Sequence, residues 1–178
     1  MALVFQYGSN MSVARLNGED RLAGDAKVVC VAKTVERFEF IFSVWSTSNK
    51  CAAADLLPSY AGRSVYGVLY EIPDFLLSRD TAKERGRKSL DAIEGEGTNY
   101  VRTMIDVVTN YGATVPAMTY VVKIRQTDLK TSAAYVSHIL AGLRENNMPE
   151  EYCKYVRAKI LESNAELIDA MLLPTPDA

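Results

Sequence analysis

Residues that commonly bind metal ions are scarce in this sequence. Its 178 residues include one histidine and three cysteines, Cys30, Cys51 and Cys153, which lie far apart. No two of the cysteines have the Cys-x-x-Cys spacing of a zinc site, and one histidine cannot complete such a site. We therefore expect no bound metal, and three free thiols in a reducing compartment.

The sequence also lacks an excess of charge of one sign and any long apolar run. It has 20 Lys and Arg against 22 Asp and Glu, so its net charge of −2 provides no basic face for nucleic acid. No segment approaches the ~18 apolar residues that a membrane-spanning helix needs. The start of the chain does not have the basic and apolar regions of a signal peptide. We expect a cytoplasmic protein that binds neither nucleic acid nor membranes.

What remains is the composition of a globular protein. With 48% hydrophobic and 24% charged residues, the chain is close to the soluble average, and its length suits a single domain over residues 1–178. Runs rich in Val, Ile and Phe predict strands at 26–34 and 37–45, and further apolar runs predict strands at 2–7, 50–57, 65–72, 100–109 and 115–124. Together they predict an α+β fold, a small mixed β-barrel of about six strands with helices packed outside.

Helical periodicity dominates the last third of the chain. From Ser132 onward, apolar residues recur at helical spacing on both sides of Pro149, which predicts two helices. Short helical segments are also predicted at 12–16, after Pro73, at 89–93 and at 167–172. Within the strand at 65–72, Gly67 indicates either a close approach of two backbones or a bulge.

The segment Tyr7-Gly8-Ser9-Asn10-Met11 is the first candidate for chemistry. It follows the first predicted strand, and Gly8 allows a ligand to approach the backbone. The next amides, at the start of a short helix, can donate hydrogen bonds to a carboxylate or an oxyanion. The alternative is a plain strand-to-helix turn capped by a serine or asparagine side chain.

The second candidate is an acidic segment around Glu94. The run Leu90-Asp91-Ala92-Ile93-Glu94-Gly95-Glu96-Gly97 places this carboxyl group at the end of a helical turn, beside a glycine. A carboxyl group held at the edge of a cavity and partly desolvated has a raised pKa, so it can act as a general base near neutral pH. The alternative is that Glu94 and Glu96 are exposed loop acids.

These two segments, in this order, resemble the γ-glutamylcyclotransferase family. The similarity continues at 65–70, 131–135, 141–142 and 147–152, and it covers positions 3 to 160. Asn10, at the fourth place of the first motif, argues against the glutathione-specific branch of this family. The Asn-x-Pro-x-x-Tyr pattern that ends at Tyr152 is more similar to the enzyme that acts on γ-glutamyl amino acids.

The resemblance implies release of 5-oxoproline from γ-glutamyl amino acids or amines, without a cofactor. The substrate's own α-amino group attacks its γ-carbonyl group and expels an amino acid or an amine. The family's catalytic glutamate corresponds to Glu94, and Glu96 is the rival for this role. The resemblance assigns substrate binding to Val4, Phe5, Gln6, Tyr7, Gly8, Ser9, Asn10, Tyr100 and Tyr135.

Two alternatives to this function remain open. One keeps the chemistry but removes a γ-glutamyl protecting group from an amine metabolite. The other is a metabolite-binding module without catalysis, against which the presence of Glu94 argues. In each case the partner is a small molecule, and the segment 43–63, with Trp45 and Tyr60, is predicted to form part of the wall opposite the glutamyl moiety. The family contains dimers, so the resemblance also leaves a homodimer open.

Overall fold

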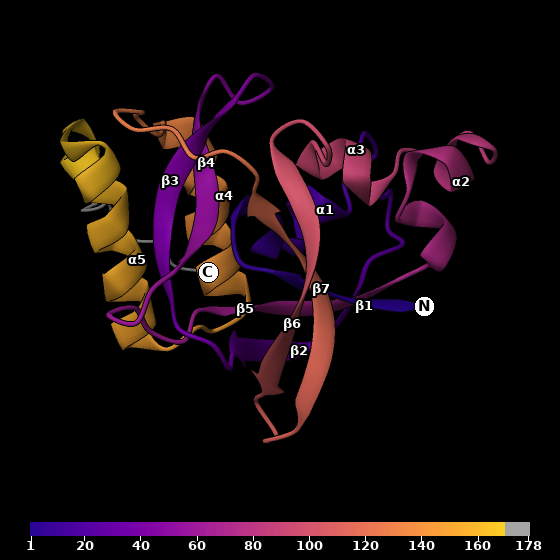
Figure 1. Cartoon of the computed structure of the whole chain (residues 1–178), viewed down its shortest axis with the longest axis horizontal. Coiled ribbons are helices and arrows are strands. Elements are labelled where there is room, and N and C mark those ends of the chain that lie inside the picture. The colour runs from indigo at the N-terminus through magenta and orange to yellow at the C-terminus, as the bar shows by residue number, and fades with distance from the viewer. Residues whose placement is uncertain (170–178) are drawn as a thin grey trace.

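A computed structural model describes residues 1–169, which contain seven strands (Figure 1). They are β1 (Ala2–Gln6), β2 (Lys27–Thr34), β3 (Phe38–Ser46), β4 (Cys51–Pro58), β5 (Tyr66–Ile72), β6 (Tyr100–Thr109) and β7 (Thr114–Val122). Each coincides with a strand predicted from the sequence, and the bounds differ by at most two residues.

Five of these strands close into a barrel, in the order β1-β5-β2-β6-β7. The strand β1 pairs antiparallel with β5 and parallel with β7, so both of its edges are covered. The strands β3 and β4 pair only with each other, as a separate two-stranded sheet. The predicted α+β barrel fold is confirmed, with five strands in the barrel where about six were expected.

A buried side chain ties the β3–β4 sheet to the barrel. Asp55 on β4 is fully buried, and its carboxylate accepts a hydrogen bond from the backbone N–H of Val122 on β7, at 2.9 Å. It also accepts from Ser43 at 2.9 Å and from Arg125 at 2.7 Å. Because β1 and β6 already pair with β7 and close the barrel, the sheet contacts the barrel through this carboxylate without joining its ladder.

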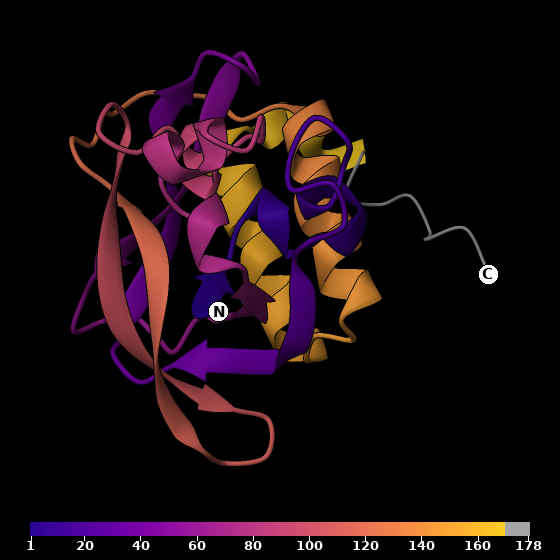
Figure 2. The ribbon, with the colours of Figure 1, turned by 90° about the vertical axis from the view of Figure 1, so that its right-hand side faces the viewer.

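The helices cover the outside of the barrel and of the β3–β4 sheet. They are η1 (Ser9–Met11), α1 (Val13–Leu16), η2 (Asp74–Leu76), α2 (Arg79–Lys83), α3 (Leu90–Glu94), α4 (Ala133–Glu145), α5 (Glu150–Ser163) and η3 (Ala165–Leu167). The helix α5 lies beside β3 (Figure 1), and α4 packs on η1 and α1 (Figure 2). The predicted helical segment at 167–172 overlaps the end of η3, and its second half lies outside the described residues. None of the helices within residues 1–169 combines the length and the apolar character that crossing a membrane requires.

Serine caps fix where four of the helices begin. The side chains of the residues preceding α1, α2, α3 and α4 each accept a hydrogen bond from a backbone N–H in the first turn; these residues are Ser12, Ser78, Ser89 and Ser132. Such a cap satisfies one of the N–H groups that a helix start leaves unpaired. The caps thereby fix the residue at which each of these helices begins.

At Gly67 and Gly142 the chain makes close contacts that a larger residue would disturb. A Cβ at Gly67 would lie 2.4 Å from the carbonyl oxygen of Gln6 and 2.6 Å from the ring of Phe5. A Cβ at Gly142 would lie 2.6 Å from the Cβ of Met11, where α4 meets η1. The close approach expected at Gly67 is confirmed, and it seats β1 tightly on β5.

Replacing Gly67 by alanine is expected to destabilise the protein by about 1–3 kcal/mol, because the added methyl group overpacks a closed core. Gly18→Ala is the matched control, since a Cβ at Gly18 mainly meets the movable end of the Asp20 side chain, at 3.1 Å. Urea denaturation of the two variants measures the difference. An equal loss of stability in both would contradict the assignment of Gly67 to a close backbone contact.

Candidate active site

Two cavities meet at Glu94. The inner cavity has a volume of about 30 Å³, and the outer cleft has a volume of about 300 Å³. Both are lined by Ser9, Asn10, Glu94, Tyr100 and Tyr135. The structure therefore brings the glycine-containing segment after β1 and the acidic segment of α3 together around one carboxyl group, and a ligand in the cleft can reach it.

Local structure places the Glu94 carboxylate with little freedom. Glu94 is the last residue of α3, and Gly95 ends the helix in the left-handed conformation, with φ of 70°, which glycine adopts without strain. The side-chain amide of Asn10 donates to Glu94 Oε1 at 2.8 Å. The other end of this amide accepts from Arg21 Nη1 at 2.9 Å. A chain of hydrogen bonds from Arg21 through Asn10 thus orients the carboxylate.

The surroundings of Glu94 make it a better base than an exposed glutamate. Desolvation raises its pKa above the ordinary value of 4.5, and the hydrogen bond from Asn10, the amide of Gln6 and the charges of Arg21 and Arg15 oppose this shift without cancelling it. Gln6 is buried, and its Nε2 has no well-formed hydrogen bond within residues 1–169. Because buried donors are almost always paired, this amide is available to an acceptor on a ligand.

Tyrosine hydroxyl groups form one wall of the inner cavity. Tyr100 Oη donates to the carbonyl oxygen of Ala54 at 2.7 Å, and Tyr135 Oη accepts from the N–H of the same residue at 3.1 Å. Burial raises the pKa of both tyrosines, so both hydroxyl groups stay protonated. Since Tyr135 accepts from Ala54, its own hydroxyl hydrogen is free to be donated to a ligand.

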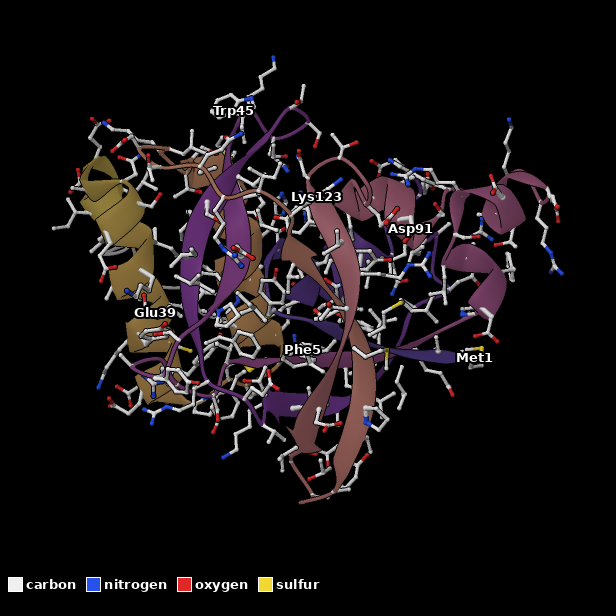
Figure 3. The ribbon with its side chains drawn as sticks, in the orientation of Figure 1. Met1, Phe5, Glu39, Trp45, Asp91 and Lys123 are labelled. Carbon is white, nitrogen blue, oxygen red and sulfur yellow. The ribbon has the colours of Figure 1, made fainter. Side chains whose placement is uncertain are left out.

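Asp91 fixes α3 to the barrel. It is buried, and its carboxylate accepts from Tyr120 Oη on β7 at 2.8 Å and from Arg102 Nε on β6 at 2.9 Å, while a second guanidinium nitrogen of Arg102 completes a bidentate pair. Figure 3 shows Asp91 on α3, beside the barrel. Asp91 lies three residues before Glu94 and therefore holds the helix that positions it. The sequence did not indicate this role of Asp91.

Most of the predicted site residues line these cavities, and two do not. Those in the inner cavity are Gln6, Tyr7, Gly8, Ser9, Asn10, Glu94, Tyr100 and Tyr135. Val4 and Phe5 are fully buried in β1 and line neither cavity, because these adjacent side chains point to opposite faces of the strand and both faces are packed. Glu96, the alternative base, also lines neither cavity, and its carboxylate pairs with Arg79 Nη1 at 3.3 Å.

The segment 43–63 contributes to the outer cleft, but through residues other than those expected. The strand β3 supplies its last residue, Ser46, the turn after it supplies Thr47, Ser48 and Asn49, and β4 supplies Ala53. Trp45 and Tyr60 are not among the lining residues. The ring of Trp45 projects from the tip of the sheet (Figure 3), and Tyr60 is fully exposed on the chain that follows β4.

Sequence reasoning also missed two arginines of the outer cleft. Arg15 on α1 and Arg21 in the turn after it both line the cleft near Glu94. The periodicity of a four-residue helix does not show which way its side chains point, so the sequence carried no signal for them.

Comparisons with known proteins agree with this fold. The sequence pattern of the AIG2-like family matches residues 64–156, just over half of the chain. A solved structure named gamma-glutamyl cyclotransferase has a TM-score of 0.71 and 22% identity, covering 88% of this chain and 86% of that one. An uncharacterized protein from Homo sapiens has a TM-score of 0.72 and 24% identity over the same shares. YkqA from Bacillus subtilis has a TM-score of 0.69 and 22% identity, and covers 89% of this chain but only 54% of its own. A search of curated proteins found no match.

We expect Glu94→Gln to stabilise the protein at alkaline pH. The pKa of Glu94 is higher in the folded state than in the unfolded state, so the folded state binds the proton more tightly. This contribution to stability is fully present below the unfolded pKa, and it is lost as the pH rises through the folded pKa. The variant does not suffer this loss. At about pH 8 its Tm should therefore exceed that of the native protein.

Calorimetry at about pH 8 and about pH 4 checks this sign, because the difference in Tm should vanish where Glu94 is protonated in both states. Glu96→Gln is the control, since it removes a carboxylate that is paired with Arg79 and lines neither cavity. A variant of Glu94 that is less stable than the native protein at the higher pH would contradict the desolvated site.

Proposed function

The chain belongs to the AIG2-like family and has the fold of a solved gamma-glutamyl cyclotransferase, and on this premise we propose that it releases 5-oxoproline from γ-glutamyl amino acids or amines. The observation that carries the proposal is the Glu94 carboxylate, which has a raised pKa and lies where two cavities meet. The outer cleft, at about 300 Å³, has room for a small γ-glutamyl substrate beside this carboxylate, and the inner cavity brings hydrogen-bond donors to the same point.

The reaction needs one group that accepts a proton and later returns it. The α-ammonium group of the substrate loses a proton to the Glu94 carboxylate, and the neutral nitrogen then attacks the γ-carbonyl carbon. The new C–N bond closes a five-membered lactam. As the original C–N bond breaks, the protonated Glu94 gives its proton to the departing nitrogen. The ring nitrogen still carries two hydrogens, and it loses the second one through the same carboxylate to the released amine, which leaves as an ammonium group, so the lactam is neutral and the carboxylate is restored.

Positioning accounts for much of the rate. The nucleophile and the carbonyl group belong to one molecule, so a site that folds the glutamyl chain correctly captures an effective molarity of about 10⁵ M or more. Asn10 holds the carboxylate through its 2.8 Å hydrogen bond, and Asp91 holds the helix that carries it. Tyr135 has a hydroxyl hydrogen free to orient the substrate.

Hydrogen-bond donors for the developing oxyanion come from the other side of the inner cavity. The backbone N–H groups of Ser9 and Asn10 lie in the first turn of η1, where no acceptor within the helix is available. The amide of Gln6 lines the same cavity, and its Nε2 has no well-formed hydrogen bond within residues 1–169. In known acyl-transfer sites one such donor stabilises the transition state by ~3–4 kcal/mol.

The direct test is release of 5-oxoproline from γ-glutamyl-alanine, ε-(γ-glutamyl)-lysine, glutathione and a γ-glutamyl alkylamine. Glu94→Gln is expected to lower kcat by at least ~100-fold, the usual contribution of a general base. Glu96→Gln, the matched control, should retain native turnover. Binding of a γ-glutamyl ligand without turnover by the folded native protein would favour a metabolite-binding module instead.

The pH dependence of kcat/KM provides a second prediction. Activity should rise with pH as Glu94 loses its proton, with a midpoint above 4.5. Asn10→Ala removes a hydrogen bond that lowers the pKa of Glu94, so its midpoint should move to higher pH. Rate profiles of both proteins with one substrate measure the shift. A midpoint that stays in place, or moves to lower pH, would show that Asn10 does not act on the base.

A further inference from the structure

The wall of the inner cavity depends on a strand that does not belong to the barrel. Ala54 on β4 lines this cavity, and β4 pairs only with β3. The carbonyl oxygen of Ala54 accepts from Tyr100 Oη at 2.7 Å, and its N–H donates to Tyr135 Oη at 3.1 Å. One peptide unit of β4 therefore holds both tyrosine hydroxyl groups, and a shift of this strand would displace them.

The residue that follows Ala54 determines where β4 lies. Asp55 is fully buried, and both oxygens of its carboxylate are used. Its Oδ1 accepts from the N–H of Val122 at 2.9 Å. Its Oδ2 accepts from Ser43 at 2.9 Å and from Arg125 Nε at 2.7 Å. Because these partners lie on β3, on β7 and in the chain after β7, they hold β4 against the barrel from several sides.

The contacts of Asp55 form a closed ring that includes Tyr100. Val122, whose N–H binds Asp55, is the residue of β7 that pairs with Tyr100 on β6. The hydroxyl group of Tyr100 then returns to Ala54, next to Asp55 in the chain. Both the main chain and the hydroxyl group of this tyrosine therefore depend on two adjacent residues of β4.

The ring requires a carboxylate at position 55. The hydroxyl group of Ser43 and the guanidinium group of Arg125 converge on one oxygen, Oδ2, which can only accept. The amide nitrogen of an asparagine at this place would meet both of them as a donor. The charge of Asp55 also reaches the cavity, because burial, and then this charge, raise the pKa of Tyr7, which lines it.

We propose that Asp55 is a positioning residue, which holds β4 so that Ala54 and the ring through Tyr100 place the hydroxyl group of Tyr135 for the substrate. The inference rests on the proposed function and extends it to a residue that lines neither cavity. Asp55 acts through Tyr135, whose hydroxyl hydrogen is free to be donated to a ligand.

The test is a double-mutant cycle with γ-glutamyl-alanine as substrate. Asp55→Asn keeps the shape of the side chain and should lower kcat/KM by about 10- to 100-fold, since a misplacement of about 1 Å can cost about 100-fold. In the Tyr135→Phe background the same change should lower kcat/KM by less than about threefold, because the hydroxyl group that Asp55 positions is absent. Equal losses in both backgrounds would overturn the inference, because Asp55 would then act on the fold as a whole.

Two further variants keep this test sharp. Asp25→Asn is the matched control, since it removes another Asp–Arg pair, that with Arg87 at 2.6 Å, and lines neither cavity; its kcat/KM should equal the native value. Ser43→Ala removes one bond to the same oxygen of Asp55 and keeps the ion pair, so it serves if Asp55→Asn does not fold. It should give a smaller loss of kcat/KM that disappears in the Tyr135→Phe background, and an additive loss would overturn the inference.

A spectroscopic measurement separates this inference from the proposed function. In protein with ¹³C-labelled tyrosine, the Cζ signal of Tyr135 is identified by its absence from Tyr135→Phe. This signal should move in Asp55→Asn, although Asp55 does not contact Tyr135 through any hydrogen bond within residues 1–169, and it should stay in place in Asp25→Asn. A signal that stays in place in Asp55→Asn would overturn the inference. Failure of the folded native protein to release 5-oxoproline would contradict the proposed function, and the signal would still decide whether Asp55 positions Tyr135.

Discussion

The hydrogen bond between Asn10 and Glu94 joins two segments that are 84 residues apart in the sequence. Each of them is anchored independently. Asn10 lies in η1, between β1 and α4, and Glu94 ends α3, which Asp91 fastens to β6 and β7. Because both anchors belong to rigid elements, the bond holds the carboxylate at the junction of the two cavities, where a loop alone would let it turn toward solvent.

The site keeps polar groups in an unsatisfied state that a protein core would not tolerate. Burial raises the pKa of Glu94, and the amide of Gln6 has no well-formed hydrogen bond within residues 1–169. Both features cost stability in the free protein, and a ligand that supplies a proton and an acceptor relieves them. The α-ammonium and γ-carbonyl groups of a γ-glutamyl substrate supply both. This coincidence of needs links the fold to the proposed chemistry.

Much of the fold was predictable because its signals are local. Six of the seven strands were marked by runs that include β-branched or aromatic residues, β4 by an apolar run of Ala and Leu, and the helices by their caps and periodicity. The separation of β3 and β4 from the barrel was not predictable, since it depends on a long-range pairing, that of Val4 on β1 with Met118 on β7, which closes the barrel. In the site, the motifs located Glu94 and its cavity, whereas the place of Arg15 in the cleft depends on the direction of a single helical turn. Val4 and Phe5 differ from their neighbours in the chain, which line the cavity, because both of their side chains are buried in the core.

The most direct test of this account is the titration of Glu94 itself, by NMR of protein with ¹³C-labelled glutamate carboxyl groups. The account predicts one glutamate signal that titrates above 4.5 and is absent from the spectrum of Glu94→Gln. If the signal missing from the variant instead titrates at or below the ordinary value in the native protein, Glu94 is a solvated acid and not a general base poised by its surroundings.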